Sequence, residues 1–275
     1  ITDNLDILSS VVKVKPSGGR GENKTFELYG IRKLRELILD LAMRGALVPQ
    51  DPNKESATEL CKKIKTQRLK QIKEGKLKKQ KILPHIEETE KPFSLPSNWK
   101  WIRLGEATNY GINEKIEALH AKEETWVLEL EDIEKSTSKL LKKVRFIKRP
   151  FKSSKNRFYK SDVIYGKLRP YLDKVVLADE DGVCTTEMIP IRGYMGINAE
   201  FLRWAMKSPY FINYANNSTH GMNLPRMGTD KARLALIPLA PEEEQPLIVA
   251  KVNELMELCD QVQQVQLKNI QTHNM

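Results

Sequence analysis

Apolar residues near the start of the chain recur at the spacing of an α-helix. The repeat is formed by Ile31, Leu34, Leu37, Ile38 and Leu41. Gly45 and Pro49 follow it, and both residue types commonly end helices. Further along, Ser56 with Glu59 three positions later has the pattern of a capping box. The sequence therefore predicts two consecutive helices within residues 29–82.

From Trp99 to about residue 238 the pattern changes to short runs rich in β-branched and aromatic residues, which predict strands. The runs are WIRLG, TWVLELEDI, KVRFI, SDVIYGKL, KVVLA, CTTEMIPIR and RLALIPL. A helical stretch over 198–217 interrupts them. A segment containing three prolines, residues 83–98, precedes this region and is typical of a linker. We therefore predict a mixed α+β domain over 99–238.

The last part of the chain has the apolar spacing of a helix that pairs with another helix. Pro241 opens it, and three glutamates fill the first turn, where the positive end of the peptide dipoles favours carboxylates. Steps of four and three residues then connect the predicted pairing positions Ile248, Val252, Leu255, Cys259 and Val262. This is heptad spacing, although so short a repeat is also compatible with an ordinary core-facing helix. We expect the partner to be the 31–41 helix or a helix of a second copy of the chain.

The charge balance adds a partner class to this picture. The net charge is +10 and the pI is about 9.3, so a polyanion is the leading partner. Between Lys62 and Lys81 there are ten Lys or Arg residues and one acid, a run that could equally be a solvated helix face. No stretch approaches 18 uninterrupted apolar residues, so nucleic acid is favoured over a membrane. Three widely spaced cysteines and no visible signal peptide favour a reducing cytoplasm.

The stretch YGKLRPYLDKVV, residues 165–176, combines basic and aromatic side chains. On a strand, alternate residues share a face, which would place Tyr165, Lys167, Arg169 and Tyr171 together. Such a face suits the phosphates and sugars of DNA, and Lys174 would extend it. Pro170 suggests that the strand ends or lies at a sheet edge there.

Two predicted loops supply forked donors and amides that could read base edges. The first contributes Lys148, Arg149, Lys152, Lys155, Asn156 and Arg157. The second contributes His220, Asn223 and Arg226. The alternative is that the lysines only keep a loop solvated and that the amides near residue 217 only cap the preceding helix.

Motifs of catalysis are missing from the sequence. The Gly-Lys pair at 166–167 lacks the other residues of a phosphate loop, and no dinucleotide, zinc-protease or nucleophile-elbow motif is present. No Cys or His pair has zinc spacing. Asp162, Glu187 and Lys167 could be arranged around a metal, but many such triples arise by chance among 36 acidic residues. Two hypotheses compete with a DNA-binding role that involves no catalysis. One is a stand-alone DNA-modifying or DNA-cleaving enzyme, and the other is a coiled-coil adaptor that binds only protein.

Several stretches, in order, resemble the specificity (S) subunit of type I restriction–modification enzymes. They are LRELILDLAMRGALVPQDPNKESATELCKKIK, LPSNWKWIRLGE, VLELEDIE, SDVIYGKLRPYLDKVVLA, GVCTTEMIPIR, STHGMNLPRM and IPLAPEEEQPLIVAKVNELMELCD. The resemblance covers nearly everything from Tyr29 onward. Single pieces are weakly specific, and their shared order makes the resemblance strong.

The resemblance implies a non-catalytic subunit that reads half of a split DNA site with each α+β target recognition domain. Long helices would pair antiparallel as a spacer. Methylation and cleavage would belong to modification (M) and restriction (R) subunits, which would hold S-adenosylmethionine, ATP and Mg²⁺, while this chain would hold no cofactor. The expected partners are double-stranded DNA, the M and R subunits, and possible homodimer formation through the helices, without a membrane.

One departure from the family pattern is that this chain has a single recognition domain, where the full family member has two. It would therefore be either a shortened piece of a two-domain subunit or a half-length subunit that dimerises. The expected organisation is a flexible lead-in over 1–28, an N-terminal helical region over 29–82, a linker over 83–98, the target recognition domain over 99–238 and the spacer helix over 241–270.

Overall fold

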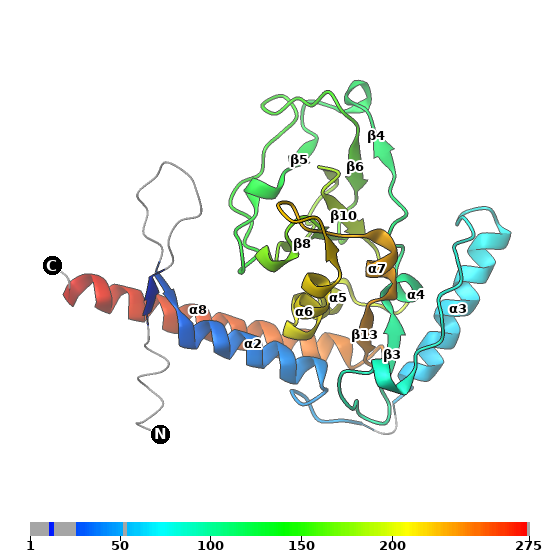
Figure 1. Cartoon of the computed structure of the whole chain (residues 1–275), viewed down its shortest axis with the longest axis horizontal. Helices are drawn as coiled ribbons and strands as arrows, with labels where there is room; N and C mark the ends of the chain where they lie inside the picture. The colour runs from blue at the N-terminus through cyan, green and yellow to red at the C-terminus, as the bar shows by residue number, and fades with distance from the viewer. Residues whose placement is uncertain (1–10, 14–25, 52–53, 274–275) are drawn as a thin grey trace.

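Two helices that lie side by side form the base of the molecule in the computed structural model (Figure 1). The model describes residues 11–13, 26–51 and 54–273, so most of the predicted lead-in lies outside the described residues. Helix α2 spans Tyr29–Met43 and helix α8 spans Gln245–His273, and the two run in opposite directions. Before α2, strands β1 (Val11–Lys13) and β2 (Phe26–Leu28) form an antiparallel pair.

The contact between α2 and α8 is a cluster of apolar side chains. From α8, Ile248, Val252 and Cys259 are buried and Leu255 is partly buried. Val262 is 45% exposed and is not part of this apolar cluster. The α2 helix contributes Ile31, Ile38, Leu39, Ala42 and Met43. Leu34 and Leu37, which the sequence pattern placed on the same stripe, are instead exposed.

Residues 99–238, which we call the recognition region after their predicted role, form a set of small sheets with helices, and the predicted α+β class is confirmed. The first and last strands, β3 (Lys100–Arg103) and β13 (Leu236–Leu239), pair antiparallel and bring the ends of the region together. A four-stranded sheet has the order β4 (Lys115–Ile116), β6 (Lys155–Phe158), β9 (Gly182–Cys184) and β5 (Trp126–Leu128). A three-stranded sheet has the order β10 (Met188–Ile191), β7 (Val163–Gly166) and β8 (Val175–Leu177).

Helices and short turns complete this region. The helices are α4 (Leu104–Ala107), α5 (Ala199–Lys207), α6 (Pro209–Asn217) and α7 (Thr229–Leu234). The 3-10 turns of this region are η3 (Ala118–His120), η4 (Leu130–Asp132) and η5 (Pro170–Leu172), and a further turn, η2 (Glu88–Glu90), lies in the segment before it. The hairpin strands are β11 (Thr219–His220) and β12 (Arg226–Met227). Figure 1 shows β4, β5 and β6 at the end of this region that is far from α2 and α8.

Within residues 125–147, two predicted strand runs are wrong. The run TWVLELEDI is a strand only over Trp126–Leu128, because Glu129 and Asp132 form a capping box that starts the η4 turn. The run KVRFI is not a strand. Arg145 forms an isolated bridge to Trp126, and the chain then turns through hydrogen bonds from Arg149 N to the carbonyl oxygens of Arg145 and Phe146.

Helix α5 joins the recognition region to the helical pair because both of its faces are buried. Leu202 and Met206 pack into the core beneath strands β7 and β8. Phe201, Trp204 and Ala205 pack into the cluster shared by α2 and α8. The side chain of Asn198 caps the helix by accepting hydrogen bonds from the backbone N–H groups of residues 200 and 201.

Buried polar side chains fix the start of α8 against the recognition region. Gln245 donates from Nε2 to the carbonyl oxygens of Gly196 and Ala240, at 3.0 and 3.1 Å, and accepts a bond of 2.8 Å from the N–H of Asn198. The carboxylate of Glu244 accepts a bond from Trp99 Nε1 at 3.1 Å. The buried side chains of Gln245 and Glu244 therefore both have hydrogen-bond partners, and these bonds fix the orientation of α8 against the recognition region.

Helix α3 (Ala57–Lys73) packs on the recognition region rather than on α2. Its buried residues Ala57, Leu60 and Ile64 belong to the recognition core. The following segment is held by the buried side chain of Arg103, which donates to the carbonyl oxygens of Pro84 and His85 and to the carboxylate of Glu90. The two helices of the predicted 29–82 region therefore contribute to different apolar clusters. No described helix has an apolar stretch of the length needed to cross a bilayer.

We predict that Leu255→Asp lowers the free energy of unfolding by about 2–4 kcal/mol, because it removes apolar contacts and puts a carboxylate into the α2–α8 cluster. Leu258→Asp is the matched control, since Leu258 is 48% exposed on the same helix. Urea unfolding of both variants at one low protein concentration measures the difference. Equal losses in the two variants would contradict the assigned packing.

Candidate nucleic-acid interface

Two segments far apart in the sequence meet to form the candidate surface. They are the loop after β7, residues 167–174, and the β11–β12 hairpin, residues 219–227. The backbone N–H of Arg169 donates to the carbonyl oxygen of Pro225 at 2.7 Å, and that of Met227 donates to Lys167 O at 3.1 Å. Arg169 Nη2 also lies 3.4 Å from the carbonyl oxygen of Asn223. The hairpin and the loop are therefore one hydrogen-bonded unit, which we call the loop–hairpin surface.

The predicted strand through residue 171 is wrong, because β7 ends at Gly166. Arg169 and Asp173 adopt left-handed backbone conformations, with φ of 51° and 47°, and the η5 turn lies between them. Tyr165 therefore does not share a face with the basic residues. Its side chain is 2% exposed and meets the ring of Phe211 edge-on, so we no longer assign it to the surface.

The exposed side chains of the loop–hairpin surface are basic, amide and apolar. Arg169, His220 and Asn223 are exposed, and Lys167 and Arg226 are half-buried. Arg226 forms an ion pair of 2.9 Å with Glu187, which holds its guanidinium in place. Tyr171, which the sequence analysis had named, is exposed, and Met222 and Leu224 are exposed apolar members that it did not single out. The signal that could have found Met222 is its position after a glycine within a polar loop.

A buried ion pair supports this surface from below. Lys207 on α5 is 5% exposed, and its ammonium lies 2.5 Å from a carboxylate oxygen of Asp173 and donates to Ser138 Oγ at 2.7 Å. Burial raises the pKa of the Asp173 carboxyl to about 6 and lowers the pKa of Lys207. This group positions the loop, since Asp173 directly follows the η5 turn. The sequence shows only one weak sign of it, a lysine on the apolar side of a helix.

The neighbouring residue Lys174 has a structural role in the described fold. Its Nζ donates to the carbonyl oxygen of Leu130 at 2.7 Å, and burial lowers the pKa of this amine. The predicted DNA contact of Lys174 stays a prediction, because this hydrogen bond uses one of the three N–H donors of the ammonium group. Lys174 therefore ties the loop to the η4 turn in the structure.

The predicted residues at 148–157 lie in and before strand β6 of the four-stranded sheet, and three of the six are paired with carboxylates. Arg149 pairs with the fully buried Asp132, Lys155 pairs with Glu129, and Arg157 lies 3.2 Å from Glu114. Asn156 is 1% exposed and donates to the carbonyl oxygen of Met188, so its burial removes it from any direct base contact. Lys148 and Lys152 are exposed and have no ion pair with a described residue.

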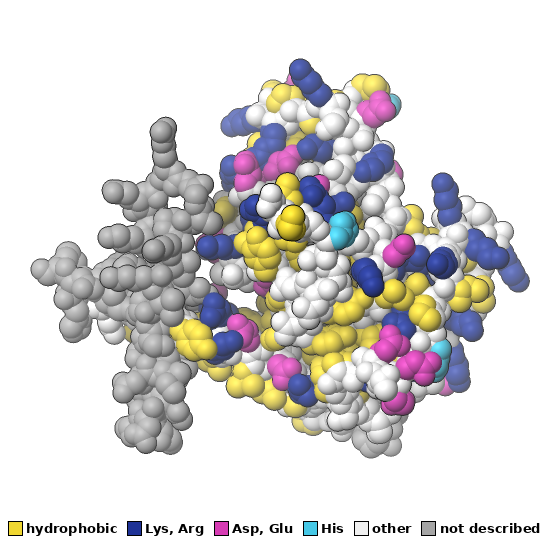
Figure 2. Space-filling model, in the orientation of Figure 1, with side chains coloured by type: hydrophobic (Ala, Val, Ile, Leu, Met, Phe, Trp, Pro, Cys, Tyr) yellow, Lys and Arg dark blue, Asp and Glu magenta, His cyan; other side chains and the backbone are white. Residues whose placement is uncertain are grey.

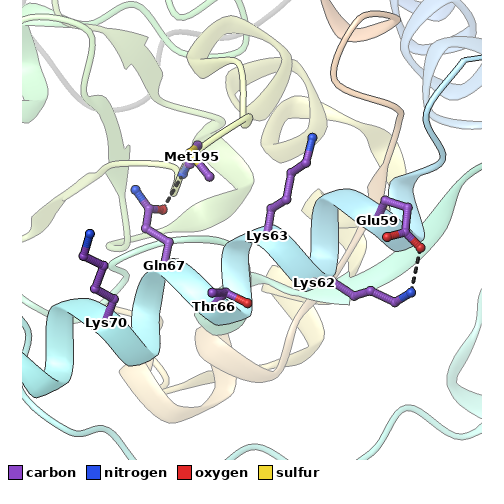
Figure 3. A pocket seen from close by; sticks show the side chains of 7 residues that line it. All are labelled: Glu59, Lys62, Lys63, Thr66, Gln67, Lys70 and Met195. Carbon is purple, nitrogen blue, oxygen red and sulfur yellow. Dashed lines mark hydrogen bonds and ion pairs between the residues drawn. The ribbon is translucent and has the colours of Figure 1, made fainter.

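The outer face of α3 carries a hollow of about 470 Å³ (Figure 3). Its walls are the side chains of Glu59, Lys62, Lys63, Thr66, Gln67 and Lys70, together with Met195. Gln67 accepts a hydrogen bond of 3.0 Å from the N–H of Met195, which ties α3 to the loop before α5. The hollow contains none of the residues predicted to contact DNA. Its lysines belong to the basic run recognised in the sequence.

The three residues considered as a chance metal site are not assembled into one. Asp162 is bound by Arg192 at 2.8 Å, and Glu187 is bound by Arg226. Among the residues that the structure describes, no group of three His, Cys, Asp or Glu side chains is arranged to hold a metal ion. Each of these carboxylates instead anchors an arginine.

We predict that Lys207→Met lowers the free energy of unfolding by about 3 kcal/mol near neutral pH, because it leaves Asp173 buried without its counter-charge. The pKa of Asp173 in the folded protein, about 6, lies above its ordinary value of 3.8. The stability that this group contributes is therefore present at low pH and lost as the pH rises through about 6. In the variant the neutral acid is tolerated, so the loss should shrink markedly near pH 4.5, about one unit or more below that pKa.

Unfolding titrations in urea at the two pH values measure this difference. Lys33→Met is the matched control, because it removes an exposed ion pair with Glu36 and should change stability by less than about 1 kcal/mol at either pH. A loss in Lys207→Met that does not vary with pH would contradict the assigned role of Asp173.

Comparison with known proteins finds relatives that match nearly the whole chain. No protein-family model matches the chain. It is 37% identical to the type I restriction enzyme EcoEI specificity subunit of Escherichia coli and 35% identical to the EcoAI specificity subunit of the same species. Each match covers 99% of this chain and 47% of the relative. The crystal structure of the HsdS subunit from Thermoanaerobacter tengcongensis matches with a TM-score of 0.55 and 27% identity, covering 65% of this chain and 47% of that one.

The resemblance found in the sequence is thus confirmed along nearly the whole chain. The two relatives are named specificity subunits of type I restriction enzymes and the solved structure is named an HsdS subunit, and in each case about half of the matched protein is covered. The chain is a homologue of the specificity subunits of type I restriction enzymes, and it spans about half the length of the curated relatives it matches.

Proposed function

We propose that the chain recognises one half of a bipartite DNA site and acts as a scaffold for modification and restriction subunits in the cytoplasm. The observation that carries this proposal is the loop–hairpin surface, where Lys167, Arg169, His220, Asn223 and Arg226 come together from two distant segments. Basic side chains fix a protein on the phosphates, and arginine and amide groups read base edges. The homology to specificity subunits supports the same role.

The exposed cations outside this surface would contribute to the affinity without reading sequence. Lys148 and Lys152 are exposed in the segment before β6, and Lys62, Lys63 and Lys70 line the hollow on α3. Because phosphate contacts release counterions, their contribution should depend strongly on salt. We therefore assign sequence reading to the loop–hairpin surface and assign general attraction to these lysines.

The helical pair would receive a second half-subunit. Leu258, Val262 and Val265 are exposed at steps of four and three residues along α8 and so share one helix face. Leu34 and Leu37 are exposed on α2. Apolar residues repeated along exposed helix faces suit pairing with further helices, and in this proposal a second copy of the chain supplies them.

Catalysis would belong to the partners, which would hold S-adenosylmethionine, ATP and Mg²⁺. The rival hypothesis of a stand-alone DNA-modifying or DNA-cleaving enzyme is tested by incubating the purified chain with duplex DNA and Mg²⁺, and separately with a labelled methyl donor. The proposal expects no turnover until M subunits are added. Methylation or cleavage by the chain alone would support the rival.

We predict that Arg169→Gln weakens duplex binding and lowers the slope of log affinity against log salt by about 0.9, the value expected for one lost phosphate contact. Lys251→Gln on α8 is the matched control, because it removes an exposed cation far from the loop–hairpin surface in sequence. Fluorescence anisotropy with a labelled duplex, at several salt concentrations and with M subunits present, provides the slopes. An unchanged slope in Arg169→Gln would contradict the phosphate contact.

We predict that Val262→Asp abolishes self-association, because it places a charge in the middle of the exposed apolar face of α8. The control is Gln264→Asp, an exposed position on the same helix. Sedimentation velocity should show concentration-dependent dimers for the unaltered chain and for the control, and monomers for Val262→Asp. Monomers at every concentration for the unaltered chain would argue against the dimer.

A further inference from the structure

Met222 is the most exposed large apolar side chain in the described part of the molecule, with its full surface open to solvent. It lies in the connection between β11 and β12, with Leu224, 45% exposed, two residues on. Tyr171, 52% exposed, belongs to the η5 turn that is tied to this hairpin through Arg169. Single exposed apolar residues are ordinary, but three of them on one hydrogen-bonded unit are less so.

The hairpin presents Met222 on a fixed base. Thr219 pairs with Met227 and His220 pairs with Arg226, and a bridge joins Arg226 to Leu168. The chain reverses at Gly221, whose φ of +92° is a conformation that side-chain-bearing residues rarely adopt. The projection of Met222 is therefore determined by backbone geometry rather than by its own packing.

Basic side chains surround the apolar tip at Met222, which is the arrangement expected for binding a polyanion that has an apolar interior. The segment 218–227 contains no acidic residue, and Arg169, His220 and Arg226 flank the tip. The nearest carboxylate partner, Glu187, is occupied by the Arg226 guanidinium. Figure 2 shows hydrophobic and basic side chains on the face where Figure 1 draws this gold-coloured loop, with acidic side chains also present on that face. A DNA groove offers this combination, with phosphates at its rims and base surfaces at its floor.

We propose that the β11–β12 hairpin enters a groove of duplex DNA and places the Met222 side chain against the bases, while Arg169 and Lys167 contact the flanking phosphates. The inference rests on the proposed function and names the residue that provides an apolar base contact. An unbranched thioether side chain adapts its shape to base edges and thymine methyl groups, and methionine also occurs among the apolar residues that wedge between base steps. Since the contact is uncharged, it would contribute to base discrimination and leave the salt dependence unchanged.

The test compares Met222→Ala, Met222→Leu and the matched control Met195→Ala, each as the full chain with M subunits. Met195 is a methionine of similar chemistry, 48% exposed, that lies in the α3 hollow (Figure 3). The unaltered complex first selects its preferred duplexes from a random-sequence pool. Affinity for a selected and an unselected duplex is then measured for every variant over a range of salt concentrations.

The expected result is that Met222→Ala loses about tenfold or more in affinity for the selected duplex, the effect of one buried side chain, and little for the unselected duplex. Its salt slope should equal that of the unaltered complex. Met222→Leu should retain most of the discrimination, and Met195→Ala should behave like the unaltered complex. This pattern would separate Met222 from Arg169, whose loss changes the salt slope.

Three results would overturn the inference. Met222→Ala could keep the original discrimination, or it could lose equal affinity for both duplexes. It could also release the M subunits without a change in base preference, in which case Met222 would contact protein. If the unaltered complex selects no sequence at all, the proposed function fails and this inference fails with it, an outcome distinguishable from the failure of Met222 alone.

Discussion

The structure depends on one constraint: helix α5 has no free face. One side of it packs beneath the sheet that contains β7 and β8, and the other side packs against α2 and α8. An amphipathic helix normally buries one stripe and leaves the rest to solvent. Because α5 buries both, the recognition region cannot rotate on the helical pair without opening two apolar clusters. The polar ties of Gln245 and Glu244 at the start of α8 restrict the same motion.

This constraint extends to the candidate interface through a short chain of contacts. Lys207 at the end of α5 holds Asp173, and the left-handed backbone of Asp173 closes the η5 turn. That turn is hydrogen bonded to the β11–β12 hairpin. The position of the loop–hairpin surface is therefore fixed relative to α2 and α8. In the proposed function, these helices would set the distance to a second recognition domain. A protein that binds two half-sites needs each recognition domain to be held rigidly on the spacer helices. Only then does binding depend on the distance between the two half-sites.

The sequence predicted the parts of the fold that follow from periodicity. The helices over 31–41 and 248–262 were found because apolar residues repeat there, and the α+β class followed from short β-rich runs. The path of residues 165–176 was not predictable in the same way. Its shape depends on positive φ angles at Arg169 and Asp173, which cannot be predicted from an arginine or an aspartate in the sequence. It also depends on the contact between Asp173 and Lys207 of α5.

The candidate site shows the same division. Sequence reasoning found the two basic segments but could not tell a cation that is free from one that is already engaged, as Arg149, Lys155 and Arg157 are. Pairing of this kind depends on carboxylates that lie about 17 to 43 positions away in the chain. Exposure, in contrast, was the property that identified Met222, and it becomes visible only when the hairpin is folded.

Mapping of methylated bases across a genome tests the central claim most directly. Cells that express the cognate M subunit would be compared with and without this chain. The account predicts that the chain confers methylation at a defined bipartite motif, with both halves present in each modified site. Methylation that is the same in both cells, or that shows no motif when the chain is present, would contradict it.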